Sequence, residues 1–260
     1  MSRPSVPIVL LGLLGLAAVA AAFAGVNRAR AKQLRRTPVT TAPVRRPAPA
    51  PVAAKVSPRP VSYGIAEVRA GRSVALRSKP GGRVVADVGA RTEFGSPASL
   101  SVASTHGAWL GVTSTQLPNG KIAWVKASKA LEMHRTPVSI HVDLSKRRLE
   151  LRKGDTTLRR FDVAIGRPGS RTPTGRFAIT DKLAGSRYGP YYGCCILALS
   201  GHQPHTPAGW QGGDRLAIHG TDSPSTIGTP ASAGCLRASD SDLRVLMRRV
   251  PVGTPVFIHA

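Results

Sequence analysis

Residues 216–221 read Leu-Ala-Ile-His-Gly-Thr, and residues 232–237 read Ser-Ala-Gly-Cys-Leu-Arg. The first segment is typical of an apolar strand that ends on a histidine and a glycine, and the second of a small-residue turn that presents a cysteine. Residues 222–231, between them, are rich in Pro, Ser, Thr and Gly. Because such a loop can fold back, we expect the side chains of His219 and Cys235 to meet.

A histidine beside a cysteine suits nucleophilic catalysis. A thiol is a modest nucleophile and its thiolate a strong one, so a neighbouring imidazole can activate Cys235. Gly234 removes bulk beside Cys235, and the backbone N–H groups of these two residues can point at a developing oxyanion. Arg237 suits a substrate carboxylate or braces the loop, and Ser232 can hydrogen-bond within the turn. We expect Arg237 and Ser232 on the substrate-binding side of the site.

Residues 136–260 form, by their pattern, one mainly β domain with one clear helix near its end. Alternating apolar residues between turn signals predict strands at 138–143, 148–152, 157–165, 176–180 and 255–259. Ser239 is placed to cap a helix that Pro251 and Gly253 would end. Four apolar residues share one face of that helix: Leu243, Leu246, Met247 and Val250.

This domain resembles the catalytic domain of the L,D-transpeptidases, the YkuD family. The likeness rests on His-Gly-Thr at 219–221, on Ser-Ala-Gly-Cys-Leu-Arg at 232–237, on Thr-Pro-Thr-Gly-Arg-Phe at 172–177 and on Gly-Thr-Pro-Val at 253–256. It covers effectively the whole domain. Many members have a histidine before the Gly-Cys pair, where this chain has Ala233, so a second imidazole is not available here.

The resemblance implies a role for each matched position. Cys235 would be the nucleophile and His219 its general base, and the carbonyl of Gly220 would orient the imidazole. Gly234 would contribute to the oxyanion hole, and Arg237 would be the essential arginine. The resemblance implies no cofactor, and we expect no metal.

The implied reaction is peptide-bond exchange in peptidoglycan. Cys235 attacks the carbonyl of the L-centre of diaminopimelate in a stem tetrapeptide and expels D-alanine. The side-chain amine of a second stem resolves the thioester, which gives a 3→3 cross-link. Water as the acceptor gives an L,D-carboxypeptidase instead. A third alternative is a non-catalytic wall-binding protein, against which the intact Cys235, His219 and Arg237 argue.

Residues 61–134 have the pattern of a small β module. Short apolar runs lie between turn signals, at 73–77, 84–88, 109–112 and 122–125. The segment resembles a bacterial SH3 domain, through ALRSKPGGRVVADVG at 75–89, GAWLGV at 107–112 and NGKIAWVKASKALE at 119–132. We therefore expect an SH3-like small barrel before the β-rich catalytic domain. Its role would be wall binding or simple spacing, since a fold does not fix a function.

Residues 1–27 hold an apolar run, Val6–Val26, that is long enough to span a bilayer. They are expected to be a signal peptide or an uncleaved N-terminal membrane anchor. Five basic residues follow the run closely and only Arg3 precedes it, so the positive-inside rule would place the chain in the cytoplasm. We expect an exported, extracytoplasmic protein because the implied substrate lies outside the cell.

The linker 28–60 is rich in Pro and Ala and carries nine basic residues and no acidic one. The 260-residue chain has a net charge of +24, which implies an anionic partner. Wall polymer and membrane surface both fit, whereas nucleic-acid binding would need aromatic platforms or a reading motif that the sequence lacks. The linker is expected to be an extended spacer, and the stem peptides are the expected partners of the site.

Residues 188–210 hold two cysteines, two histidines and four aromatic residues that the motif does not use. Cys194 and Cys195 match no metal-ligand spacing with His202 and His205, so a vicinal disulfide or packing in a loop over the site is expected. The aromatic residues could line the substrate cleft as a flexible lid: Tyr188, Tyr191, Tyr192 and Trp210.

If the linker is an electrostatic tether, residues 28–260 should pellet with isolated cell walls at low salt and release at high salt. Attraction between exposed charges is screened over roughly 8 Å at physiological ionic strength. The control lacks the linker and comprises residues 61–260. Equal pelleting of the two proteins at low salt would reject the tether and leave a spacer.

Overall fold

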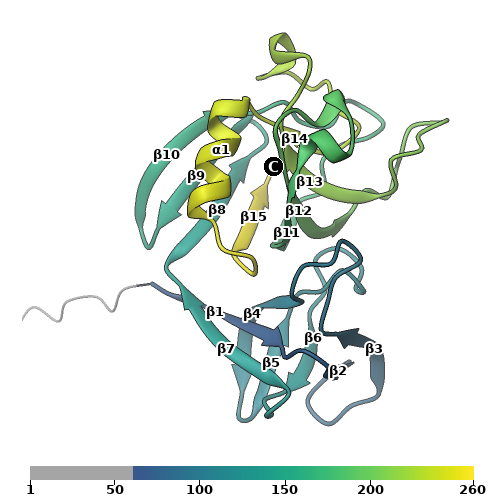
Figure 1. The fold of residues 1–260 in the computed structure, drawn as a ribbon, viewed down its shortest axis with the longest axis vertical. Coiled ribbons are helices and arrows are strands. Elements are labelled where there is room, and N and C mark those ends of the chain that lie inside the picture. Colours follow the sequence, from purple (N-terminus) through teal and green to yellow (C-terminus); the bar gives the residue numbers. More distant parts are fainter. Residues whose placement is uncertain (1–60) are drawn as a thin grey trace, which may run out of the picture. The chain divides into compact units, whose positions relative to one another are not determined.

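The computed structural model describes residues 61–260. The expected signal peptide or anchor (1–27) and the basic linker (28–60) lie outside these described residues. Within residues 61–260, no helix is both long and apolar enough to cross a membrane. The described chain is mainly β with one α-helix, as the sequence predicts (Figure 1).

The first part of the described chain forms a seven-stranded sheet with its own apolar core. Its strand order is β3-β2-β6-β5-β4-β1-β7. The strands are β1 (Tyr63–Val68), β2 (Ser73–Arg77), β3 (Val84–Gly89), β4 (Ser99–His106), β5 (Trp109–Val112), β6 (Ala123–Lys126) and β7 (Leu131–Thr136). Leu76, Val112 and Ala123 are among the residues of its buried cluster. The likeness of this part to a bacterial SH3 domain stays a prediction, as do the domain boundaries.

The second part forms an eight-stranded sheet in the order β10-β9-β8-β15-β11-β12-β13-β14. The strands are β8 (Val138–Asp143), β9 (Arg148–Lys153), β10 (Thr156–Asp162), β11 (Gly175–Ala184), β12 (Cys195–His202), β13 (Arg215–His219), β14 (Leu236–Arg237) and β15 (Pro255–His259). Alternate residues of β8 and β9 enter the core, and Ile140, Val142, Leu149 and Leu151 are fully buried. The period-two pattern of the sequence therefore marks the buried face.

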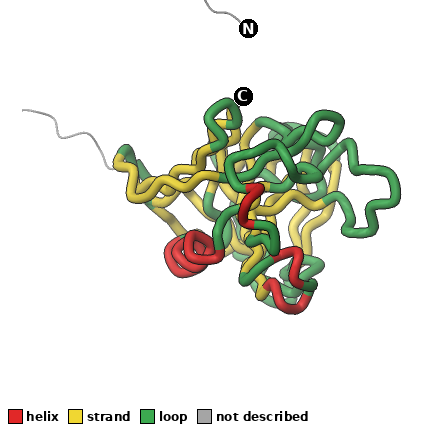
Figure 2. Tube along the Cα trace, turned by 90° about the horizontal axis from the view of Figure 1, so that it is seen from above, coloured by secondary structure: helices red, strands yellow, loops and turns green. Residues whose placement is uncertain are grey.

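The one α-helix, α1 (Asp240–Arg249), packs against β12 and closes the core of this part (Figure 1). The side chain of Ser239 accepts the Asp242 N–H and caps the helix. Leu243 and Leu246 are buried, which confirms the predicted apolar face. In Figure 2 the coil of α1 stands apart from the short 3₁₀ turns, which lie in the loops.

Two segments differ from the expected strands and loops. Cys195–Ile196–Leu197–Ala198–Leu199 begins β12, a central strand, where the sequence predicted a loop. A continuous apolar run lacks the alternation by which strands are recognised, because both of its faces are buried. The strand expected over 157–165 ends at Asp162, and beyond it Ala164 forms a separate bridge with Arg237.

Candidate active site

The parallel pairing of β13 with β14 brings the two sequence motifs together. Ile218 pairs with Leu236 and His219 with Arg237, and Cys235 directly precedes β14. His219 and Cys235 consequently line the same small pocket. The short β13–β14 ladder thus brings together two residues that are sixteen positions apart in the sequence.

His219 is held in one defined tautomer. Its side chain is fully buried, and Nδ1 lies 2.6 Å from the carbonyl oxygen of Gly220. Because a carbonyl oxygen can only accept, Nδ1 carries the proton and Nε2 keeps its lone pair. Nε2 is buried and has no hydrogen-bond partner among the described residues. The imidazole therefore presents a free acceptor inside the site, and Gly220 lies where an orienting carbonyl is required.

Both members of the pair are neutral in this structure. Burial lowers the pKa of His219 to about 4, aided by the charge of Arg237 and opposed by the hydrogen bond to Gly220. Burial raises the pKa of the Cys235 thiol to about 11, although the Ala217 backbone and Arg237 oppose the rise. At neutral pH the resting site therefore holds a thiol and an imidazole, and not a thiolate with an imidazolium.

The turn that carries Cys235 is fixed by hydroxyl groups. Ser232 Oγ accepts the N–H of Gly234 at 3.0 Å and donates to the carbonyl of Cys235 at 2.6 Å. Thr172 Oγ1 donates to the carbonyl of Gly234 at 2.8 Å and accepts the N–H of Gly166 at 2.9 Å. Ser232, expected on the substrate-binding side, here lies fully buried and braces the turn.

The oxyanion role expected of Gly234 requires a correction. Its N–H already donates to Ser232 Oγ and is not free to receive a developing charge. The N–H of Cys235 has no acceptor within residues 61–260, so it is the free backbone donor at the nucleophile. The sequence pattern did not show that the Ser232 hydroxyl would accept the hydrogen bond from the Gly234 N–H.

Gln203 is a site residue that no sequence pattern identified. Its Nε2 lies 3.1–3.2 Å from the carbonyl oxygens of Ser170, Arg171 and Ala233. It thereby ties the nucleophile turn to the loop before β11. These contacts join residues about thirty positions apart in the chain, and no local spacing reports them.

The guanidinium of Arg237 packs against the ring of Tyr191. It donates to the hydroxyl of Tyr191 and stands 4.5 Å from the centre of that ring, while its Nε is buried with no hydrogen-bond partner in the described part of the chain. Tyr191 and Tyr192 approach the His219 ring to centroid distances of 5.6 and 5.0 Å, and Trp210 lies 5.9 Å from Tyr191. Both tyrosines belong to the 3₁₀ turn η2 (Pro190–Tyr192). Three of the four expected aromatic residues therefore line the pocket.

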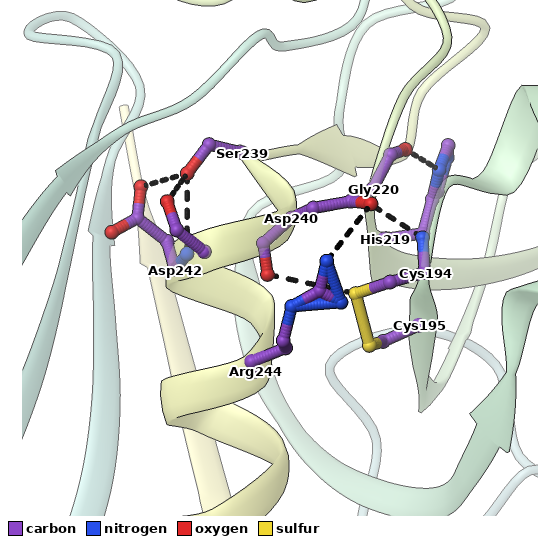
Figure 3. Close-up of a disulfide and its surroundings, with 9 residues drawn as sticks. Cys194, Cys195, His219, Gly220, Ser239, Asp240, Asp242 and Arg244 are labelled. Atoms are coloured by element: carbon purple, nitrogen blue, oxygen red, sulfur yellow. Dashed lines mark hydrogen bonds and ion pairs between the residues drawn. A yellow bond between two sulfur atoms is a disulfide. The ribbon is translucent and has the colours of Figure 1, made fainter.

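Cys194 and Cys195 form a vicinal disulfide beside the site (Figure 3). The N–H of Cys194 donates to Asp240 Oδ1 at 2.9 Å, and the carbonyl of Cys195 accepts the N–H of Gly220 at 3.1 Å. The segment therefore connects the start of α1 to the residue that orients His219. Within residues 61–260, no group of three or more His, Cys, Asp or Glu side chains is arranged to hold a metal.

Iodoacetamide alkylation of Cys235 should be slow at pH 7 and should rise about tenfold per pH unit up to pH 10. The thiolate is the reactive form, and a pKa of about 11 keeps it scarce below that pH. Glutathione provides the control with an ordinary thiol. Mass analysis of the Cys235 peptide gives the rate, and a plateau near pH 6 to 7 would contradict the neutral pair.

Replacing Gly234 by alanine should destabilise the protein and abolish turnover. The residue has φ +123°, and a Cβ atom would lie 1.8 Å from Gln203 Nε2. Gly228→Ala is the matched control, since Gly228 also has positive φ but open space around it. We expect Gly234→Ala to cost about 2 kcal/mol more than Gly228→Ala in chemical unfolding. Equal losses of unfolding free energy in the two variants would show that the Gln203 side chain can move aside without destabilising the protein.

Comparison with known proteins agrees with this geometry. The model of the YkuD family, the L,D-transpeptidase catalytic domain, matches residues 137–258. A protein of Bacillus licheniformis that carries the name L,D-transpeptidase YkuD is 34% identical over 124 residues, 47% of this chain and 66% of that protein. Its namesake in Bacillus subtilis is 31% identical over 125 residues, with the same coverage. The chain thus spans just under two thirds of the length of these relatives.

A solved structure titled L,D-transpeptidase from Mycobacterium smegmatis is 18% identical, covers 62% of this chain and 82% of its own, and has a TM-score of 0.39. Similarity at this level adds nothing to the assignment, which rests on the family model and the curated relatives. The family model and these curated relatives support a YkuD-type L,D-transpeptidase catalytic domain over residues 137–258.

Proposed function

We propose that the protein is a peptidoglycan L,D-transpeptidase that forms 3→3 cross-links through a thioester on Cys235. One observation carries the proposal. The free thiol of Cys235 lines a pocket with a neutral imidazole whose Nε2 has no hydrogen-bond partner among residues 61–260. A thiol and an unpartnered nitrogen acceptor in the same pocket are the two groups that a cysteine acyltransferase needs.

In the acylation step, Cys235 Sγ attacks the carbonyl carbon of the L-centre of diaminopimelate in the donor stem. The thiol proton passes to His219 Nε2, and the negative charge on the former carbonyl oxygen is received by the Cys235 N–H. The carbon–nitrogen bond then breaks. The leaving amine of D-alanine takes the proton from His219, so the thioester forms with the imidazole neutral again.

In the second step, the side-chain amine of an acceptor stem attacks the thioester. His219 Nε2 accepts the proton that the amine loses and returns it to the departing Cys235 sulfur. The new amide bond is the cross-link, and the thiol and imidazole are both regenerated. Water in place of the amine would give the L,D-carboxypeptidase reaction with the same proton transfers.

Arg237 contributes charge beside the reacting sulfur. Its guanidinium lowers the pKa of Cys235, which means that it favours the thiolate as the proton leaves. It also lowers the pKa of His219 and so helps to keep the base neutral before the reaction. A substrate carboxylate that approached Arg237 would need to share it with the hydroxyl of Tyr191.

The proposed substrates place the protein outside the cytoplasm, as an exported enzyme that is either anchored by residues 1–27 or released on their cleavage. Stem peptides would be both donor and acceptor. The basic linker 28–60 would hold the enzyme near an anionic wall polymer or the membrane surface.

Cys235→Ala should abolish turnover of purified tetrapeptide muropeptides, by at least about a thousandfold, because the nucleophile is lost. Ser225→Ala, at an exposed serine outside the site, is the control. Mass analysis separates the products: a cross-linked dimer indicates transpeptidation, and tripeptide monomer alone indicates the carboxypeptidase. Appreciable turnover by a well-folded Cys235→Ala protein would refute the assignment.

A further inference from the structure

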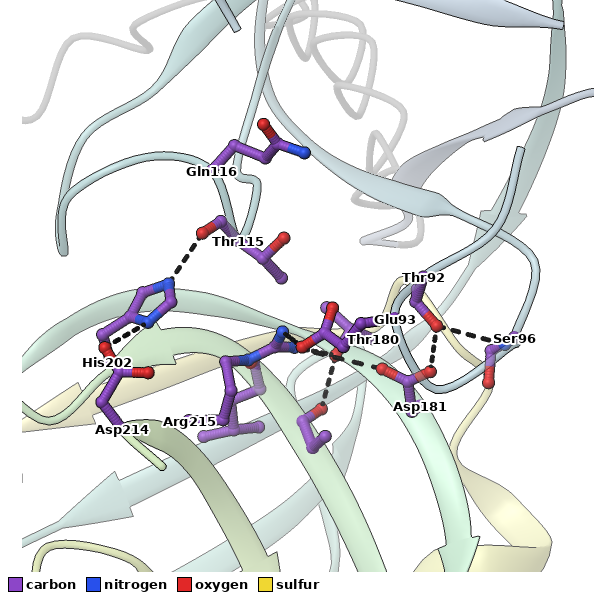
Figure 4. Close-up of polar contacts among 12 residues, drawn as sticks. Thr92, Glu93, Ser96, Thr115, Gln116, Thr180, Asp181, His202, Asp214 and Arg215 are labelled. Carbon is purple, nitrogen blue, oxygen red and sulfur yellow. Dashed lines mark hydrogen bonds and ion pairs between the residues drawn. The ribbon is translucent and has the colours of Figure 1, made fainter. Parts of the chain in front are cut away.

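A turn of the first sheet contacts the second sheet near the active site. Turn 92–96 follows β3 and is closed by the Thr92 N–H, which donates to the carbonyl of Ser96. The carboxylate of Glu93 binds the guanidinium of Arg215, as Figure 4 shows. The ring of Phe94 meets Tyr188 edge-on, with centroids 6.3 Å apart. The turn thus contacts β13 and also Tyr188, whose ring centroid lies 6.3 Å from that of Tyr192.

Arg215 connects this turn to the nucleophile. Its backbone carbonyl accepts the Cys235 S–H, with Sγ 3.8 Å from the oxygen. Its side chain is 13% exposed and donates through Nε to the carbonyl of Leu199 at 3.0 Å and through Nη2 to Thr180 Oγ1 at 2.8 Å. A shift of Arg215 would therefore move an atom that touches the reactive sulfur.

The largely buried guanidinium of Arg215 takes one of its two carboxylate partners from the turn. A buried arginine is costly unless carboxylates and other acceptors satisfy it. Glu93 contacts it directly, and the fully buried Asp181 lies 4.0 Å away. The hydroxyl of Thr92 donates to the other oxygen of Asp181, so the turn acts on both carboxylates (Figure 4).

A second contact between the two sheets fixes the end of β12. The side chain of Asn119 donates to the carbonyl of His202 at 2.6 Å and accepts the N–H of His202 at 2.8 Å. His202 precedes Gln203, which holds the turn of Cys235. Residues from the first part of the described chain therefore contact both β12 and β13.

We propose that Glu93 is a positioning residue, which acts through Arg215 to hold the carbonyl that contacts Cys235. On this proposal, the first sheet helps to set the geometry of the catalytic thiol. The turnover part of this inference rests on the proposed function, whereas the position and reactivity of the thiol do not.

The test compares Glu93→Ala with Glu132→Ala. Glu132 pairs with Arg69 in an exposed ion pair of the same sheet and touches no part of the site, so it controls for the loss of one surface carboxylate. Two quantities are measured on the full chain: kcat and KM with tetrapeptide muropeptides, and the rate of Cys235 alkylation by iodoacetamide at pH 8. Near-UV circular dichroism at the assay temperature confirms that each variant is folded.

We expect Glu93→Ala to lower kcat about tenfold with little change in KM, because a misplaced nucleophile loses alignment. Alkylation should become about threefold faster, since the protonated thiol loses its acceptor. Glu132→Ala should match the unaltered protein in both. If Glu93→Ala does not fold, Glu93→Gln replaces it, with the same directions expected.

An unchanged kcat or an unchanged alkylation rate in the folded Glu93 variant would overturn the proposal. If the unaltered protein itself shows no turnover of muropeptides, the proposed function fails, and the alkylation rates alone decide whether Glu93 positions the thiol. The two failures are therefore distinguishable.

Discussion

Where β13 runs parallel to β14, Ile218 pairs with Leu236 and His219 with Arg237, and these pairings place the base, the nucleophile and the arginine in one site. β13 supplies the histidine at its end, and the turn before β14 supplies the cysteine. The other contacts of the site refine this arrangement: Gly220 sets the tautomer of His219, and Ser232 fixes the turn of Cys235. Loss of the ladder would separate His219 from Cys235 and Arg237.

The same burial that builds the site determines its charge state. A fully buried imidazole and a partly buried thiol are both more stable as neutral groups here, and the nearby guanidinium of Arg237 further disfavours a protonated His219. Activation of the thiol therefore occurs during the reaction, when the proton moves to Nε2.

The sequence predicted the elements whose patterns are local. The bounds of β2, β5 and β8 match the expected segments, and Ser239 caps the predicted helix. β12 was missed because its apolar run is buried on both faces and gives no alternation. The residue types of the site were readable from two motifs, but the bracing contacts of Gln203 depend on distant parts of the chain. No single-sequence spacing reports such contacts.

Intact-protein mass spectrometry after a brief incubation with a donor tetrapeptide stem, quenched in acid without an acceptor, tests the central claim most directly. We expect an acyl adduct that maps to Cys235, with one D-alanine released for each adduct formed. Release of D-alanine with no adduct on Cys235, or an adduct of the same mass on the Cys235→Ala protein, would contradict it.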